Sequence, residues 1–231
     1  MKPLRILVAC EESQEVTKAF RALGHEAYSC DLKPCSGGHP EWHIQEDVME
    51  VIYFGWELIR NQAGDDLIPV KQWDMIIAFP ECTHIAVSGA RHFAEKRADG
   101  RQRAAIEFFL AMWEAPCDHI AIENPVGIMS GDRKYLKKYY PDLYERAKNL
   151  PQPQMIQPWQ FGHPESKKTC LWLKGLPELK ETKNVYEEMM ALPLSKRTRI
   201  HYMSPGPLRA EMRSKTYPGI ANAMSTQWSN P

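Results

Sequence analysis

Four side chains that can do chemistry stand where short apolar runs of this sequence end: Asp31, Asp47, Cys82 and Glu123. Cys82 follows an apolar run and a proline, at the start of a polar loop, where its thiolate could act as a nucleophile. The two aspartates could hold a nucleoside, one through the ribose hydroxyls and the other through an adenine amino group. A cysteine and then a glutamate at consecutive run ends form a more specific pattern than either residue alone.

Each of these residues also has an ordinary structural explanation. Most cysteines are packed and inert. Aspartates at strand ends are often caps or turn residues, and Glu123 could be an exposed strand terminus. The chemical interpretation therefore depends on the elements that position the four side chains.

The spacing of apolar residues predicts these elements. Runs rich in β-formers predict strands at six places: 4–9, 26–31, 74–79, 119–122, around 155–161 and around 170–173. Helical spacing predicts three helices: 14–23, 101–114 and 219–228. Strands that alternate with helices predict a Rossmann-like α/β fold with a doubly wound, mostly parallel sheet. Ligands of such a sheet bind beyond the carboxyl ends of its strands, which is where the four side chains fall.

Five segments of the chain keep the order of motifs in a known enzyme family: His39–Val48, Phe79–Gly89, Glu123–Pro125, Phe161–Thr169 and Gly219–Met224. In this order they resemble the segment leading to an adenine-contacting aspartate, a Pro-Cys nucleophile loop, a Glu-Asn-Val motif, a later basic motif and a C-terminal Gly-Asn-Ala helix. The family is the DNA cytosine-C5 methyltransferases, and the chain is especially similar to their compact phage-borne members.

The resemblance implies transfer of a methyl group from S-adenosylmethionine to C5 of cytosine in DNA. Cys82 would form a covalent adduct at C6 of the base, and Glu123 and Lys167 would be the other catalytic residues. The resemblance implies a cofactor site made of Ala9, Cys10, Glu11, Asp31, Asp47, Pro80 and Asn222. It also implies that Ser88 and Lys168 contact DNA. We expect a monomer in the cytoplasm of a bacterium or a phage-infected host, where it would protect phage DNA against restriction.

A local basic segment supplies further candidate DNA contacts. Between residues 196 and 215 a single acidic residue stands among six basic ones. The predicted DNA contacts in this segment are Lys196, Arg197, Arg199, Arg209 and Arg213. Such a cluster could neutralise several phosphates, or it could be a solvated, loop-rich face. We predict a catalytic domain over 1–176, a small recognition region over 177–216, and a C-terminal helix over 217–231 that returns to the catalytic domain.

Three departures from the family pattern leave other functions open. The stretch from Ala9 to Ser13 has no glycine where the family has a glycine-rich cofactor loop. Glu81 stands where a proline is usual, and Thr169 where an arginine is usual. One alternative is a related C5-pyrimidine modification with another donor, or on RNA or a free nucleotide. Another is a catalytically inactive DNA-binding homologue, although a binding protein needs neither Cys82 nor Glu123.

Composition adds few constraints. The chain has 29 basic and 29 acidic residues, so its net charge gives no support for a nucleic-acid partner, although a local patch can still bind one. The apolar runs are too short to span a membrane, and we interpret the six cysteines as reduced thiols. A zinc site is a weak alternative at Cys30, Cys35, His39 and His43, because zinc fingers separate their ligand pairs by about 12 residues. No metal is predicted.

Overall fold

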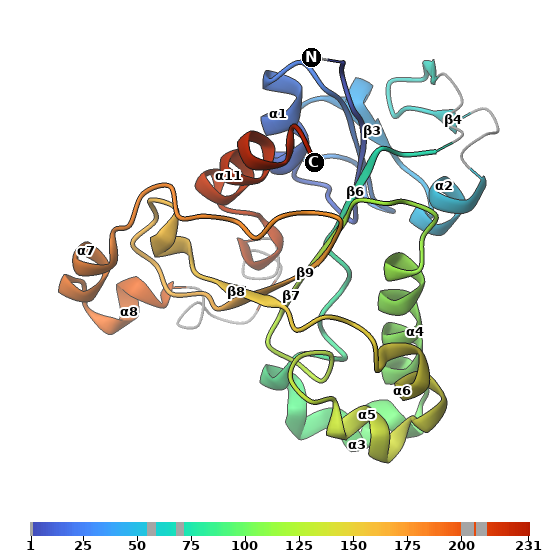
Figure 1. The fold of residues 1–231 in the computed structure, drawn as a ribbon, viewed down its shortest axis with the longest axis vertical. Helices are drawn as coiled ribbons and strands as arrows, with labels where there is room; N and C mark the ends of the chain where they lie inside the picture. The colour runs from blue at the N-terminus through green and yellow to red at the C-terminus, as the bar shows by residue number, and fades with distance from the viewer. Residues whose placement is uncertain (1, 55–58, 68–71, 200–205, 207–211) are drawn as a thin grey trace.

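The computed structural model describes residues 2–54, 59–67, 72–199, 206 and 212–231. Within these residues, seven strands form one sheet in the order β3-β2-β1-β6-β7-β9-β8 (Figure 1). The strands are β1 (Arg5–Ala9), β2 (Glu26–Cys30), β3 (His43–Ile44), β6 (Met75–Ala78), β7 (Ile120–Pro125), β8 (Gln154–Ile156) and β9 (Thr169–Lys174). A separate small hairpin pairs β4 (Ile59–Arg60) with β5 (Asp66–Leu67).

The sheet is parallel over its first five strands. From β1 the chain moves outward to β2 and β3, then returns to place β6 and β7 on the other side of β1. The order therefore reverses between β1 and β6, and the crevice at such a reversal is where doubly wound folds bind ligands. Only β9 runs in the opposite direction, because it is antiparallel to both β7 and β8. The predicted Rossmann-like α/β fold with a mostly parallel sheet is confirmed.

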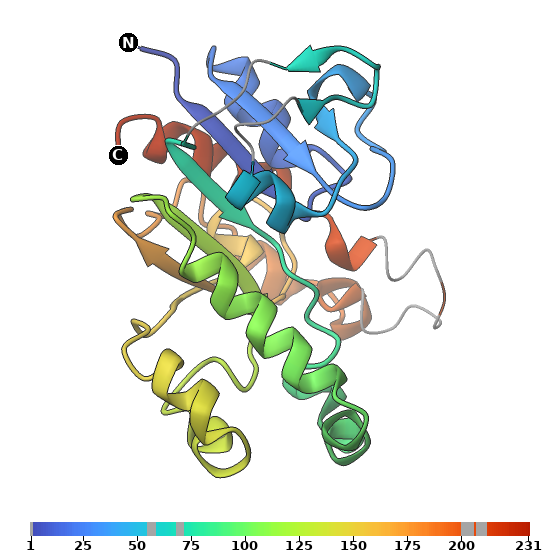
Figure 2. The ribbon, with the colours of Figure 1, turned by 90° about the vertical axis from the view of Figure 1, so that its right-hand side faces the viewer.

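Helices cover both faces of the sheet (Figures 1 and 2). On one face, α1 (Glu15–Ala22) packs beside α11 (Pro218–Trp228), and Phe20 and Trp228 are fully buried there. On the other face α4 (Arg101–Trp113) buries Ile106 and Phe109 against Trp172 of β9. Side chains of a strand alternate between the two faces, so β1 sends Ile6 to one core and Leu7 to the other. The central strands β1 and β6 are buried on both sides, which explains their continuous apolar runs.

Shorter helices lie in the segments that connect the strands. They are α2 (Val48–Phe54), α3 (Phe93–Ala98), α5 (Lys134–Tyr139), α6 (Pro141–Ala147), α7 (Tyr186–Ala191) and α8 (Leu194–Arg197). Three 3₁₀ turns lie in the connections: η1 (Pro40–Trp42) between β2 and β3, η2 (Val87–His92) before α3, and η3 (Pro158–Gln160) between β8 and β9. These short elements were not predicted, because one or two helical turns show too little apolar periodicity.

The sequence predictions of the main elements agree with the structure to within a few residues, with one exception. The strand predicted over 155–161 is wrong beyond Ile156, because Pro158 begins η3 and cannot donate a ladder hydrogen bond. The described part of the 177–216 region contains α7 and α8. The three-part domain division stays a prediction. No described helix is long and apolar enough to cross a membrane.

Candidate active site

The loop that follows β6 carries Cys82, and the carboxyl-terminal half of β7 carries Glu123, so the two residues lie at the same edge of the sheet. The two strands are parallel neighbours, with Ala78 paired to Ile122. Asn124, which is 1% exposed, donates from Nδ2 to the carbonyl of Pro80 at 2.9 Å, so β7 holds the loop that carries Cys82. The neighbouring strand ends therefore fix the nucleophile candidate beside the acid candidate.

The loop after Cys82 is fixed from a second side. Its first turn closes when the amide of Ala86 donates to the Cys82 carbonyl at 2.9 Å. Lys96 of α3 donates to the Thr83 carbonyl at 2.6 Å, and Gln102 of α4 donates to the His84 carbonyl at 3.0 Å. Both donors are buried. The sequence analysis did not predict these two hydrogen bonds, although Gln102 on the apolar face of the predicted helix 101–114 was a signal for one of them.

Burial and charge set the protonation of Cys82. Burial raises the pKa of its thiol, and the negative charge of Glu123 raises it further. The positive charges of Arg213 and Lys167 lower it. The net effect is a raised pKa, so the resting residue is a thiol at neutral pH. Glu81 has an exposed side chain, and the largest charge effect on the thiol comes from Glu123 rather than from this sequence neighbour.

The carboxyl of Glu123 also has a raised pKa. Burial raises the pKa of its carboxyl, and this outweighs the positive charge of Lys167 and a hydrogen bond with Thr169, which both lower it. Thr169 faces Glu123 because Pro125 of β7 pairs with Thr169 of β9 and side chains alternate along both strands. Glu123 therefore keeps its proton to a higher pH than an ordinary glutamate, which suits a group that donates a proton.

We predict that the reactivity of Cys82 toward iodoacetamide rises with pH to a midpoint above that of an ordinary cysteine. Glu123→Gln removes the nearest negative charge and should lower the midpoint, whereas Lys167→Gln removes a positive charge and should raise it. The measurement is the rate of alkylation at residue 82 by mass spectrometry, with Cys35 as the reference thiol in the same spectra. Two variants that shift the midpoint in the same direction would contradict the charge arrangement.

Lys167 is tied to the segment that precedes α11. Its Nζ donates to the carbonyl of Arg213 at 2.8 Å and lies 6.0 Å from the centre of the Tyr217 ring. Glu165 accepts hydrogen bonds from Arg199 at 2.9 Å and from the Tyr217 hydroxyl at 3.0 Å. The basic motif and the segment before α11 thus lie together, and this brings the charge of Arg213 to Cys82.

Three predicted cofactor residues lie near one another at the ends of β1, β2 and β3. Besides burial, the charges of Asp31 and Asp47 raise the pKa of Cys10. Asp31 Oδ1 accepts from the amide of Lys33, and Asp47 Oδ1 accepts from the amide of Met49, each at 2.9 Å. The aspartates are therefore turn and cap residues, as the structural explanation predicted. Each still has its second oxygen for a ligand, because a carboxylate accepts about four hydrogen bonds.

Glu11 caps α1. Its Oε1 accepts from the amide of Val16 at 2.7 Å, and its Oε2 accepts from the amide and hydroxyl of Thr17. Burial raises the pKa of Glu11 to about 7 despite these bonds. The preceding residue, Cys10, has a φ of 59°, a left-handed conformation that favours glycine. Both oxygens of the Glu11 side chain accept hydrogen bonds, and its amide donates to the Cys30 carbonyl at 3.2 Å, so this residue already has structural partners within the protein.

The remaining predicted site residues differ in their exposure and in their contacts. Ala9 and Pro80 are buried, and Asn222 is exposed on α11. Ser88, Lys168, Lys196 and Arg213 are exposed. Arg197 contacts the sulfur of Met190, and Arg199 pairs with Glu165, so their side chains already have contacts within the protein. Arg209 lies outside the described residues.

The chain was compared with known proteins. No family model matches it, and no curated protein matches it. The solved structures that are similar to it include two methyltransferase structures. One is an E. coli protein assigned as a DNA modification methyltransferase encoded within a prophage, with 13% identity and a TM-score of 0.46 over 83% of this chain and 56% of that chain. The other is the Entamoeba histolytica methyltransferase EhMeth, with 12% identity and a TM-score of 0.41 over 80% of this chain and 58% of that chain. This chain therefore spans somewhat more than half the length of either structure.

The two histidines of the zinc alternative have other partners. His43 contacts the hydroxyl of Ser29 at 2.8 Å and the carbonyl of Lys33 at 2.9 Å. His39 stacks on Trp42 with ring centres 3.8 Å apart. In the part of the chain that the structure describes, no group of three His, Cys, Asp or Glu side chains is placed to hold a metal ion.

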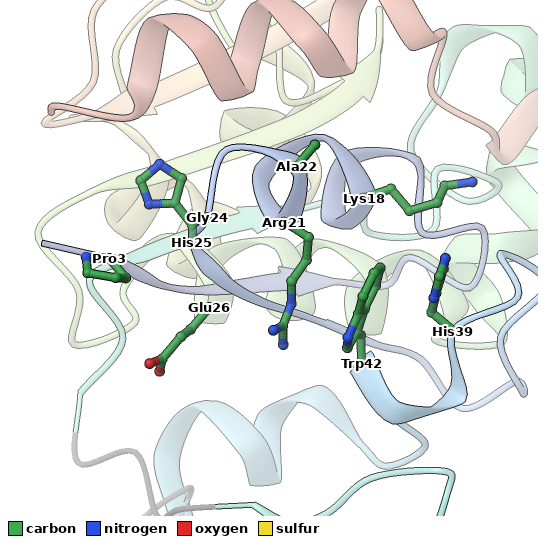
Figure 3. A pocket seen from close by; sticks show the side chains of 9 residues that line it. All are labelled: Pro3, Lys18, Arg21, Ala22, Gly24, His25, Glu26, His39 and Trp42. Atoms are coloured by element: carbon green, nitrogen blue, oxygen red, sulfur yellow. The ribbon is translucent and has the colours of Figure 1, made fainter. Parts of the chain in front are cut away.

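A separate open hollow of about 590 Å³ lies between α1, the start of β2 and η1 (Figure 3). Its polar side chains are already used within the protein. Lys18 pairs with Glu15, and Arg21 donates to the carbonyl of Ala27 while its guanidinium lies over the ring of Trp42. None of the predicted site residues lines the hollow. We therefore assign the candidate site to the carboxyl edge of the sheet.

Proposed function

We propose that this protein methylates C5 of cytosine in DNA, with Cys82 as the nucleophile and Glu123 as the proton donor. The observation that carries the proposal is the placement of these two side chains on neighbouring parallel strands, close enough for the charge of Glu123 to act on the Cys82 thiol. The charge of Glu123 raises the pKa of Cys82, and Lys167 acts on both groups. A protein that only binds DNA has no need for this pair.

S-adenosylmethionine would supply the methyl group, and the residues at the ends of β1, β2 and β3 fit it. Asp31 and Asp47 each keep one carboxylate oxygen that no described residue occupies, as hydrogen-bonding to ribose hydroxyls and an adenine amino group requires. Pro80 would form the boundary between this site and Cys82. Asn222 of α11 would be a further contact.

The chemistry assigned to the chain's own residues balances as follows. The target base leaves the duplex, at a cost of about a few kcal/mol. The Cys82 thiol first loses its proton to water, and the thiolate bonds to C6 of cytosine. The C5–C6 double bond shifts to C4–C5, the electrons of the C4–N3 double bond move to N3, and Glu123 gives N3 its proton. C5 is then nucleophilic and takes the methyl group. Loss of the C5 proton to a base expels the Cys82 thiolate, and N3 returns its proton to Glu123. Lys167 would hold the base or an adjacent phosphate.

Duplex DNA that carries 5-fluorocytosine tests the whole sequence of steps. Fluorine replaces the C5 proton whose loss releases the enzyme, so the adduct should persist. We expect an adduct in which residue 82 is joined to a methylated base, identified by mass spectrometry after incubation with S-adenosylmethionine. An adduct at another residue, or none from a folded protein that binds both DNA and donor, would contradict the proposal.

A second candidate is C5 modification with another donor, or on RNA or a free nucleotide. The observation that favours it is the loop after β1, where the Glu11 side chain occupies the first amides of α1 and no glycine gives a close backbone approach. Calorimetric titration with S-adenosylmethionine separates the two candidates. Binding favours the first, and absence of binding to a folded protein favours the second.

A further inference from the structure

The surface formed by α3 and α5 has the chemistry of a nucleic-acid contact. We name it the α3–α5 surface and define it as Arg97, Tyr135, Lys137, Lys138 and Tyr139. The two helices lie together at one end of the molecule, at the bottom of Figures 1 and 2. Sequence analysis assigned no function to them.

This surface is physically continuous with the candidate active site. Helix α3 follows the Cys82 loop through η2, and α5 follows the loop after β7. The Tyr135 hydroxyl donates to Gln102 Oε1 at 2.8 Å, and the Nε2 of the same glutamine holds the His84 carbonyl in the Cys82 loop. The ring of Tyr135 also contacts Phe93 of α3 with centres 5.4 Å apart. The α3–α5 surface is therefore linked to the Cys82 loop through the two hydrogen bonds of Gln102.

Three cations on the surface are held by aromatic rings rather than by carboxylates. The Arg97 guanidinium lies 4.2 Å from the centre of the Tyr139 ring, and Lys138 lies 4.8 Å from the same ring. Lys137 lies 5.8 Å from the centre of the Tyr144 ring. Among the described residues, none of these three cations forms an ion pair. Contact with a ring leaves the full positive charge available for a partner.

Some other cations near this surface do form ion pairs with carboxylates. Lys134 on the same helix pairs with Asp132 at 2.7 Å, and Lys148 at the end of α6 pairs with Glu145 at 2.6 Å. Arg101 pairs with Glu95 at 2.7 Å. Within the described residues, the α3–α5 surface therefore carries three cations without ion pairs close together, although the chain as a whole has no net charge.

We propose that the α3–α5 surface binds the phosphate backbone of duplex DNA beside the target base, which rests on the proposed function. Cations without carboxylate partners attract phosphates. An arginine that stacks on tyrosine still presents its N–H edge to a phosphate. Tyr139, which is 39% exposed, holds Arg97 and Lys138 side by side at the surface, so the two cations can face the same stretch of backbone. The predicted basic segment at 196–215 would then not be the whole DNA contact.

The test compares two double variants that remove the same charge. Lys137→Gln with Lys138→Gln removes two unpaired cations, and Lys134→Gln with Lys148→Gln removes two paired ones. Affinity for a duplex oligonucleotide is measured against salt concentration, with the thermal midpoint as a check of folding. We expect the first variant to bind roughly 10- to 100-fold more weakly at about 0.1 M salt. Its log–log salt slope should fall by roughly 1.8, about 0.9 for each lost phosphate contact. The control variant should resemble the wild type.

The outcomes separate this inference from the proposed function, because adduct formation with 5-fluorocytosine duplex is measured on the same proteins. Equal affinity and slope in the two variants would overturn the α3–α5 surface, even if every protein still forms the Cys82 adduct. A weakened first variant with no adduct from any protein would support the surface and overturn the function. Failure of the wild type to bind duplex DNA would overturn both. Tighter binding of duplex RNA, with the same loss in the variant, would overturn DNA as the partner.

Discussion

Cys82→Ala is expected to reduce methylation of duplex DNA by at least about 10⁴-fold, because removal of a covalent nucleophile leaves only the contribution of binding and orientation. The 5-fluorocytosine adduct should disappear completely. DNA affinity should change little, since Cys82 packs beside the bound base but carries no charge at neutral pH. The measurements are the initial rate with S-adenosylmethionine, adduct formation by mass spectrometry, and affinity for unmodified duplex.

Cys35→Ala is the matched control for this prediction. Cys35 is also partly exposed, but it lies in the loop after β2, where its amide donates to Gln62. The control should keep the wild-type rate and the adduct. A Cys82→Ala protein that still turns over would remove Cys82 from the mechanism, and an inactive Cys35→Ala protein would point to general damage by cysteine replacement.

Glu123→Gln is expected to lower the rate by about 10²- to 10⁴-fold, the usual contribution of a positioned proton donor. Glutamine has the same shape but no carboxyl proton to give to N3 of the base. Adduct formation should slow in parallel, because the negative charge of the attacked ring is then unstabilised. Affinity for unmodified duplex should stay within about threefold of the wild type.

The pH dependence gives a second measurement of the Glu123 prediction. The wild-type rate should rise with pH as Cys82 loses its proton, then fall as Glu123 loses its own. Both pKa values are raised, so the maximum should lie above the range expected for an ordinary glutamate. In Glu123→Gln the falling limb should vanish. Glu81→Gln, at an exposed carboxylate next to Cys82, should keep both limbs. An equal loss of rate and DNA affinity in Glu123→Gln would argue against a chemical role.

The sequence by itself determined the strands and their ends. Buried strands such as 5–9 and 75–78 leave a continuous apolar run because both faces of the sheet are covered, and such runs are visible without a structure. The same runs place Cys82 shortly after one strand and Glu123 in the carboxyl-terminal half of another. The α/β fold also followed from the sequence, because alternating strands and long helices leave few other arrangements.

The tertiary structure decided which of these residues meet. Arg213 and Cys82 are far apart in the sequence, and only the packing of α11 on α1 and the hydrogen bond of Lys167 with the Arg213 carbonyl bring their charges together. Glu11 was predicted to bind a cofactor, yet the direction of its side chain depends on where α1 begins, and it caps that helix. Sequence periodicity carries no information on such directions.

The raised pKa values of Cys82 and Glu123 also come from the tertiary structure, since the desolvation of a group depends on all the segments that cover it. The α3–α5 surface is a third case. Residues 133–141 contain four basic residues and no acid, and only the folded arrangement pairs Lys134 with Asp132 while it leaves Lys137 and Lys138 against tyrosine rings. Local patterns specify elements, whereas charge pairing and burial are properties of the packed chain.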